Sequence, residues 1–469
     1  MPTAHIFRAF AFCALIAVVA VAAHASLPGE ARARAVVAAL STGDAATYEK
    51  AAQQNFVPAM LAGRTPQQRA QLVKTVHEEF GALEIETVDA NAGGLAVVAR
   101  GNGGRKVRFV FTFDGTPDAK IKSLSIEAGS PDDGAALKLA PPPLKAGMSE
   151  PDFARALDDW FAPHVRADAF AGVVLVARGG KPVFLRAYGP ADRERMIPAN
   201  ADTAYNVASI GKKFTHVAIA KLIQEGKLKQ STRLDDVIPD YPNAVSRVAT
   251  VDQLLNMQGG IADFFGPAFD KADKAKLNSN HAYFEYVAKL PPRFAPGAQR
   301  EYCNGCYIVL GEMIERIARQ KFEDVIRRTV FAPSGMTRSG YFDSAKLPAN
   351  TAITYGRVRG PNAPYENTRP FHGATGSGAG GVYTTAKDLL AFDNALRTNR
   401  LLNAEMTAWV LRGTPTQGRN EAPMGIAGGA PGTSAVLESG GPWTVAITAN
   451  VDPPLPERMG VAIAGALRE

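Results

Sequence analysis

Cysteine is scarce in this chain, and its basic residues form no cluster. Among 469 residues there are 3 cysteines and 7 histidines, without the paired spacings of a zinc site. We therefore predict no metal and no cofactor. The 52 lysines and arginines exceed the 45 acidic residues and give a net charge of +7, but they are spread along the chain. Because a nucleic-acid site needs a concentrated basic patch, nucleic acid is not an expected partner.

Long hydrophobic runs are also absent, with one exception near the start of the chain. Residues 9–22 are apolar, follow Arg8 and lead into Ala23-His24-Ala25. A run of about 14 residues is too short to cross a bilayer, but a basic start, an apolar core and an A-x-A end are typical of a secretory signal peptide. We predict a signal peptide over residues 1–25, cleaved near Ala25, and a periplasmic or secreted product. No later run reaches about 18 apolar residues, so no transmembrane segment is expected.

Residues 26–127 predict a small α+β domain. One helix begins at the capping box Thr65-Pro66-Gln67-Gln68 and ends at Gly81. Strand-like segments follow at 83–88, 95–99, 107–113 and 121–127. Helices followed by a strand meander are similar to the cystatin/NTF2-like accessory modules of some exported hydrolases, with Leu40-Ser-Thr-Gly-Asp44 as a loose match. We expect a role in packing, dimerisation or ligand presentation.

The rest of the chain predicts a linker and a second, larger domain. Residues 128–147 are rich in proline, glycine and aspartate, which is typical of a stiff connector. Within 148–469, hairpins are expected near both ends, at 172–177 with 182–187 and at 434–438 with 443–448. Strands from the two ends would meet in one antiparallel sheet, with the helical middle packed beside it.

Ser209-Ile210-Gly211-Lys212 places a hydroxyl and an ammonium three residues apart at the start of an apolar helix. Positions i and i+3 share a helix face, so Lys212 is expected beside Ser209. A lysine in a dry pocket has a lowered pKa and can take part in activating a serine. A surface serine next to a solvated lysine is the alternative that this motif alone leaves open.

A second element, Tyr302-Cys303-Asn304, precedes another apolar helical run. A tyrosine beside a lysine ammonium is expected to have its pKa lowered from about 10, which would let it act as a general base. Asn304 offers an amide donor and a carbonyl acceptor that can orient the lysine and bind substrate. Taken singly, a buried tyrosine and a helix-capping asparagine are also compatible with these residues.

Together these motifs resemble the serine β-lactamase and penicillin-binding-protein superfamily, in its class C β-lactamase, esterase and D-alanyl-D-alanine-peptidase branch. The resemblance covers roughly residues 150–469. Its ordered anchors are Tyr205–Lys212, Leu254–Ile261, Phe294–Gly297 with Tyr302–Asn304, Phe331–Met336, Gly380–Leu389 and Gly428–Gly432. It implies an α+β, β-lactamase/transpeptidase-like fold: an antiparallel sheet flanked by helices plus a helical subdomain.

The resemblance also implies the site. Ser209 looks like the acylated nucleophile, Lys212 its proton partner, Tyr302 the general base and Asn304 a substrate-orienting group. Gly428 and Gly429 look like the substrate-binding strand, with the backbone N–H groups of Ser209 and Gly429 forming the oxyanion hole.

The third motif departs from the family pattern. The family has Lys-Thr-Gly or His-x-Gly here, whereas this chain has Ile426-Ala427-Gly428. An isoleucine can neither hold a substrate carboxylate nor tune the tyrosine. A neutral ester or amide is therefore favoured over β-lactams and D-Ala-ended peptides. Met257 and Gly259 replace the usual histidine and serine of another anchor, which we interpret as structural drift.

Cys303 and Cys306 frame the tyrosine motif with a Cys-x-x-Cys spacing. Three states are open: a redox catalyst, a local disulfide in an oxidising compartment, or two free thiols. Two free thiols are the preferred interpretation.

The leading functional prediction is an exported serine hydrolase that acts through an acyl-enzyme on a small-molecule ester or amide, or on a cell-wall-derived substrate. The alternative is a non-catalytic or weakly catalytic binding protein with the same fold, for which Ile426 is the best support. The sequence leaves the oligomeric state open.

Overall fold

The computed structural model describes residues 27–62, 65–91, 94–102, 106–128, 139–145, 147–359 and 363–468. The predicted signal peptide and much of the predicted linker lie outside these ranges. None of the described helices combines the length and the apolar content needed to cross a bilayer.

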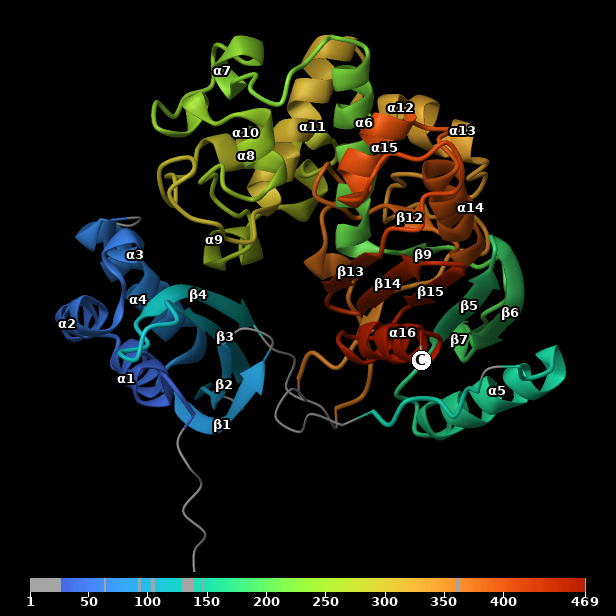
Figure 1. Cartoon of the computed structure of the whole chain (residues 1–469), viewed down its shortest axis with the longest axis horizontal. Coiled ribbons are helices and arrows are strands. Elements are labelled where there is room, and N and C mark those ends of the chain that lie inside the picture. The colour runs from blue at the N-terminus through green and yellow to red at the C-terminus, as the bar shows by residue number, and fades with distance from the viewer. Residues whose placement is uncertain are drawn as a thin grey trace, which may run out of the picture.

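The first part of the chain forms helices followed by a four-stranded antiparallel sheet in the order β1-β2-β3-β4 (Figure 1). The capping box at Thr65 and the end at Gly81 are confirmed for α4. Alternate residues of β3, Val107, Phe109 and Phe111, are buried and pack with the helices. The elements are α1 (Glu30–Ser41), α2 (Ala45–Asn55), α3 (Pro58–Ala62), α4 (Pro66–Phe80), β1 (Glu84–Asn91), β2 (Gly94–Arg100), β3 (Lys106–Phe113) and β4 (Ile121–Ala128).

The larger part of the chain is built on a five-stranded antiparallel sheet in the order β13-β14-β15-β5-β6. Strands from the beginning and the end of this part of the chain meet where β5 pairs with β15, as predicted. This confirms the α+β class, and it places β13 at one edge of the sheet. The strands are β5 (Gly172–Arg178), β6 (Lys181–Tyr188), β13 (Met424–Ala430), β14 (Thr433–Gly440) and β15 (Trp443–Ala449).

Helices cover both faces of this sheet. Side chains of a strand point alternately to opposite faces. In β5, Val174 and Val176 pack in a core with α5 (Glu150–Arg166) and α16 (Leu455–Ala466). Val173 and Leu175 pack in a second core with the helical part of the chain. Because both faces are covered, β5 reads as a continuous apolar run rather than an alternating one.

The helical part lies between the two halves of the sheet in sequence and beside it in space (Figure 1). Its helices are α6 (Gly211–Gln224), α7 (Leu234–Val237), α8 (Val251–Leu255), α9 (Pro267–Asp270), α10 (Asn280–Ala288), α11 (Asn304–Ala318), α12 (Phe322–Ile326), α13 (Ala332–Ser334), α14 (Ala386–Arg397) and α15 (Ala404–Leu411). Short strands connect these elements: β7 (Pro190–Asp192), β8 (Ile197–Pro198), β9 (Tyr205–Asn206), β10 (Tyr355–Gly356), β11 (Glu366–Asn367) and β12 (Tyr383–Thr384).

Candidate active site

Ser209 lies on a 3-10 turn, Ala208–Ile210, that runs directly into α6. The preceding residue, Ala208, has a φ of 41°, a left-handed conformation that is uncommon for a residue with a Cβ. Two hydrogen bonds hold it there. The Asn206 Oδ1 accepts from the Ala208 N–H at 2.9 Å, and the Gly381 N–H donates to the Ala208 carbonyl at 3.2 Å. The residue before Ser209 is therefore held through both its N–H and its carbonyl group.

Lys212 lies on the same face as Ser209, as the spacing predicts, and is only 6% exposed. Its Nζ donates to Ser209 Oγ at 3.0 Å, to Asn304 Oδ1 at 2.6 Å and to the Ala379 carbonyl at 2.7 Å. Burial lowers the pKa of Lys212 to about 7, against an opposing attraction from the Asp263 carboxylate. Near neutral pH a large fraction of this amine is therefore uncharged and can accept a proton.

Tyr302 also reaches Ser209, since its hydroxyl lies 2.6 Å from Ser209 Oγ. The expected lowering of its pKa is wrong. Although Tyr302 is 50% exposed, partial burial of its phenol raises the pKa to about 12, against a lowering by the hydrogen bond to Ser209, and the charges of Asp263 and Glu457 add smaller raising effects. Lys212 does not lower this pKa as expected, although its Nζ lies 4.8 Å from the ring centre, because the lysine loses its charge near pH 7. It supplies no cation at the pH where the phenol ionises.

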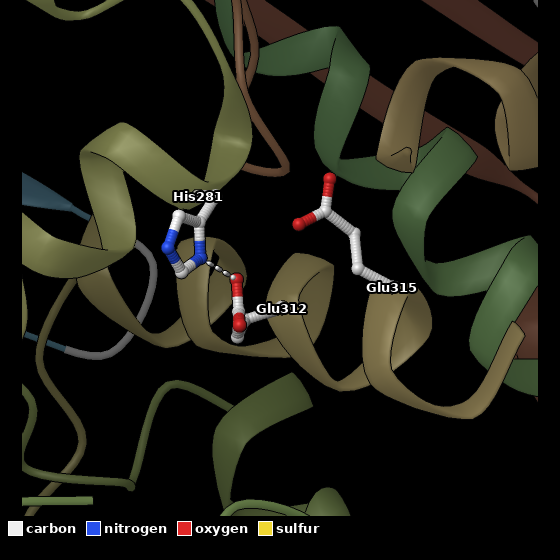
Figure 2. Close-up of side chains that lie close together, drawn as sticks. All are labelled: His281, Glu312 and Glu315. Carbon is white, nitrogen blue, oxygen red and sulfur yellow. Dashed lines mark hydrogen bonds and ion pairs between the residues drawn. The ribbon is translucent and has the colours of Figure 1, made fainter. Parts of the chain in front are cut away.

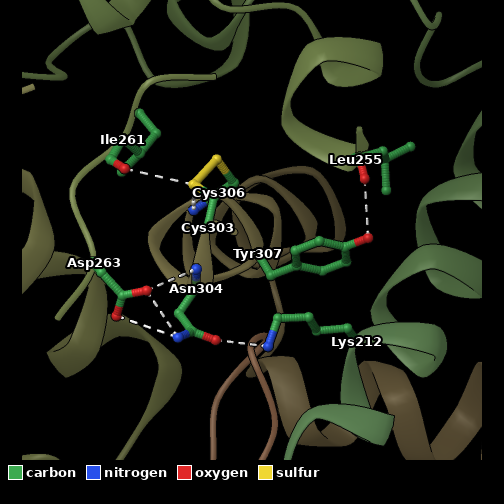
Figure 3. Close-up of a disulfide and its surroundings, with 8 residues drawn as sticks. All are labelled: Lys212, Leu255, Ile261, Asp263, Cys303, Asn304, Cys306 and Tyr307. Carbon is green, nitrogen blue, oxygen red and sulfur yellow. Dashed lines mark hydrogen bonds between the residues drawn. A yellow bond between two sulfur atoms is a disulfide. The ribbon is translucent and has the colours of Figure 1, made fainter. Parts of the chain in front are cut away.

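Asn304 is the first residue of α11 and follows a disulfide partner (Figure 3). Cys303 and Cys306 are joined by a disulfide, with their Cα atoms 5.3 Å apart, so the preference for two free thiols is wrong. Both residues are buried, at 3% and 0% exposure. The bridge spans the first turn of the helix, where the Cys303 sulfur also accepts the Cys306 N–H at 3.0 Å. It therefore braces the backbone between the two functional side chains, Tyr302 and Asn304.

The third motif lies on the edge strand β13, beside Ser209. A Cβ at Gly428 would lie 2.1 Å from the Val207 carbonyl oxygen and 2.9 Å from the Ser209 nitrogen, so the strand can approach this closely only through a glycine. Every second N–H of an antiparallel edge strand points away from the sheet. Gly429 lines the same cleft as Ser209.

Two recesses meet at Ser209. On one side, Ile426 lines a pocket with Ser209, Lys212 and Tyr302, so the side chain at the departing position of the third motif borders these three residues. On the other side lies a cleft to which several aromatic side chains contribute. Its aromatic lining residues are Phe264, Phe265, Phe269, Tyr283, Phe342 and Tyr383. Phe265 is 52% exposed, which is unusual for so large an apolar side chain.

The sequence analysis missed two groups that touch this cluster. The Asp263 carboxylate accepts hydrogen bonds from the Asn304 side chain, and the Ala379 carbonyl accepts from Lys212. Asp263 follows the anchor Leu254–Ile261 by two residues, which is the only signal that could have drawn attention to it. A backbone carbonyl such as that of Ala379 leaves no signal in the sequence.

A separate group of titratable side chains lies on α10 and α11 (Figure 2). His281 Nδ1 lies 3.0 Å from the Glu312 carboxylate, and Arg316 Nε donates to the same carboxylate at 2.8 Å. Burial raises the pKa of the neighbouring Glu315 to about 7. The charge of Glu312 is thus balanced by Arg316, and we interpret His281, Glu312 and Arg316 as an ion-pair network.

Comparison with known proteins gives a consistent result. A family model described as beta-lactamase matches residues 157–467. The chain is 26% identical over 298 residues to "Penicillin-binding protein 4*" of Bacillus subtilis (strain 168), which covers 57% of this chain and 65% of that protein. It is 26% identical over 248 residues to "D-aminopeptidase" of Brucella anthropi, covering 49% of this chain and 43% of that one. The match therefore spans less than two thirds of the length of either relative.

Among solved structures, a penicillin binding protein from Bacillus halodurans superimposes with a TM-score of 0.57 at 24% identity, over 65% of this chain and 98% of that one. This likeness concerns the fold, and it confirms the predicted β-lactamase/transpeptidase-like architecture.

Proposed function

The chain belongs to the beta-lactamase family of serine hydrolases, and on that premise we propose that it hydrolyses an ester or amide through an acyl-enzyme on Ser209. The observation that carries the proposal is the cluster of hydrogen bonds at the nucleophile. Ser209 Oγ lies 3.0 Å from Lys212 Nζ and 2.6 Å from the Tyr302 hydroxyl, while Asn304 Oδ1 holds the lysine at 2.6 Å.

In this proposal Lys212 takes the serine proton. With a pKa of about 7 against about 12 for Tyr302, the neutral amine is the available base near neutral pH, and the phenol keeps its proton. As the Ser209 Oγ–H bond breaks, its proton moves to Lys212 and a bond forms from Oγ to the substrate carbonyl carbon. The leaving group then departs with that proton, passed directly or through the Tyr302 hydroxyl. Water repeats the sequence to release the acid and free Ser209.

The negative charge on the carbonyl oxygen would be held by the backbone N–H groups of Ser209 and Gly429. The close approach of β13 at Gly428 supports this assignment, because it brings the edge strand against the serine backbone. Removal of one such donor from an acyl-transfer enzyme lowers turnover by about 100- to 1000-fold.

The substrate we propose is a neutral ester or amide with an apolar acyl group. The aromatic side of the cleft offers an apolar surface for the acyl group, and Ile426 places no charge in the pocket beside Ser209, Lys212 and Tyr302. We also propose export through the signal peptide over residues 1–25, and an accessory role for residues 26–127 joined to the hydrolase domain (148–469) by the linker 128–147.

A direct test is labelling with a fluorophosphonate probe, which should modify Ser209 in the native protein and leave Ser209→Ala unmodified. Short-chain p-nitrophenyl esters should turn over faster than nitrocefin. Failure of every acylating probe to label the folded protein would refute the acyl-enzyme. Efficient nitrocefin hydrolysis would refute the substrate preference alone.

A second candidate function, a non-catalytic binding protein, is favoured by Ile426 at a position where the family carries a polar residue. It predicts saturable binding of esters or peptides without release of product. Ligand binding by calorimetry with no acylation of Ser209 would decide in its favour.

A further inference from the structure

Asp263 lies directly behind the cluster that surrounds Ser209, without touching the nucleophile. Its carboxylate oxygens accept from Asn304 Nδ2 at 2.9 Å and 3.2 Å, from the Asn304 backbone N–H at 3.4 Å and from the Phe265 N–H at 3.1 Å. A carboxylate can only accept hydrogen bonds, so the NH₂ end of the Asn304 amide must face it. The oxygen end must then face Lys212, as Figure 3 shows.

This orientation decides what Lys212 can do. The uncharged amine has two N–H bonds and one lone pair. Two of its three neighbours, Asn304 Oδ1 at 2.6 Å and the Ala379 carbonyl at 2.7 Å, can only accept a hydrogen bond. They therefore take both N–H bonds. The lone pair is left for the third neighbour, the hydroxyl of Ser209 at 3.0 Å.

We propose that Asp263 is a positioning residue of this site: by fixing the amide of Asn304, its carboxylate directs the lone pair of Lys212 at the Ser209 hydroxyl. The inference rests on the proposed function for its catalytic consequence, but the effect on Lys212 exists whether or not a substrate turns over. With the opposite amide orientation, an NH₂ group would face Lys212. The lone pair of Lys212 would then accept a hydrogen bond from that NH₂ group instead of from the Ser209 hydroxyl.

The carboxylate also acts through its charge. Asp263 raises the pKa of Lys212, which opposes the larger lowering by burial. The other titratable groups that face this amine are the two phenols, Tyr302 and Tyr307, and burial raises the pKa of both to about 12. Lys213, next along α6, has its pKa lowered to about 8 by burial. Among the described residues, Asp263 is thus the anion whose charge raises the pKa of Lys212.

A plain structural role is the competing explanation, since a carboxylate at a helix N-terminus stabilises the helix by itself. The two differ in what they predict for Lys212. A helix cap affects only the stability of α11, whereas a positioning residue changes both the titration of the lysine and the reactivity of the serine.

The test compares Asp263→Asn with the control Asp273→Asn. Asp273 also accepts a backbone N–H in a turn, from Ala275 at 3.1 Å, but it is exposed and outside the cleft. The titration of Lys212 is followed by NMR of ¹³Cε-labelled lysine, with the signal assigned from Lys212→Arg. The rate of Ser209 labelling by a fluorophosphonate is measured on the same proteins.

In Asp263→Asn we expect the midpoint of the Lys212 titration to move to lower pH and the plateau rate of labelling to fall about 10- to 100-fold. The control should match the native protein in both. Asp263→Glu keeps the charge but displaces the carboxylate, so its midpoint should return toward the native one while the rate stays low. This variant also provides a reading if Asp263→Asn does not fold.

An unchanged Lys212 midpoint and plateau rate in Asp263→Asn would overturn the proposal, even if that variant unfolds more easily. If no probe labels the native protein, the proposed function fails, whereas the NMR titration still shows whether the Asp263 carboxylate acts on Lys212.

Discussion

The reactivity of Ser209 should follow the titration of Lys212. The structure lowers the pKa of this lysine to about 7 by burial, while the pKa of Tyr302 rises to about 12. Since the base must be uncharged, the rate should increase with pH and level off above the lysine pKa. For a pKa of about 7, the neutral fraction is about 9% at pH 6 and about 91% at pH 8, a 10-fold difference in expected rate.

The assay is the second-order rate of Ser209 labelling by an uncharged fluorophosphonate between pH 5.5 and 9.5, where the probe itself does not titrate. Lys212→Arg keeps a cation that cannot lose its proton, so its labelling should be at least 100-fold slower and independent of pH, within the about 100- to 10,000-fold effect of a general base. A rate that still rises steeply up to pH 9.5 without levelling off, as for a base with the pKa of an ordinary lysine or tyrosine, would refute the assignment of Lys212 as the base. A flat profile in the native protein would refute it equally.

Three further predictions follow from the packing. Gly428→Ala should reduce the labelling of Ser209 by at least 100-fold, because the added Cβ would lie 2.1 Å from the Val207 carbonyl oxygen, just before the turn that carries Ser209. The control Gly465→Ala should have no effect on labelling, because no atom lies within 4 Å of its added Cβ. Reducing the disulfide between Cys303 and Cys306 should lower the free energy of unfolding by about 2 kcal/mol, since the bridge closes a loop with a separation of only 3 residues; denaturant titration with and without a reductant checks this, and a much larger loss would contradict it. Arg397→Gln should lower that free energy by about 3 kcal/mol without moving the pH midpoint of labelling, because it removes one of the two arginines that pair with the fully buried Asp393 and leaves Arg419 as the other.

Much of the fold could be predicted from local patterns. The capping box at Thr65 and the alternation in β3 report structure within a few residues of themselves, so both were predicted correctly. The edge strand β13 is different, since its sequence Met-Gly-Ile-Ala-Gly-Gly-Ala carries three glycines and little strand propensity. It is a strand because it pairs with β14 over seven residue pairs. Its place was predictable only from the resemblance.

The contacts among the side chains of the first two motifs were predicted, but their electrostatics were not. The spacing of Ser209 and Lys212 fixes their contact locally, whereas the pKa of Tyr302 depends on whether Lys212 is charged when the phenol ionises. That depends in turn on how deeply the lysine is buried, which no motif reports. The role of Asp263 was hidden for a similar reason, because a carboxylate that acts through a neighbouring amide has no spacing of its own.

The burial of Lys212 itself argues for a catalytic rather than a structural role, and this can be measured. Lowering its pKa from 10.5 to about 7 in the folded protein means that folding releases a proton from this group between those two values. Stability should therefore rise with pH across that window, by about 1.4 kcal/mol per pH unit, and the cost of burying the charge is greatest below pH 7. The free energy of unfolding of the native protein minus that of Lys212→Met should increase by about 2 kcal/mol from pH 7 to pH 9. The subtraction removes every other titrating group, and also the constant loss of the hydrogen bonds that the methionine cannot make. A difference that does not change with pH would mean that the lysine keeps an ordinary pKa, and Lys212 could then not be the base that activates Ser209.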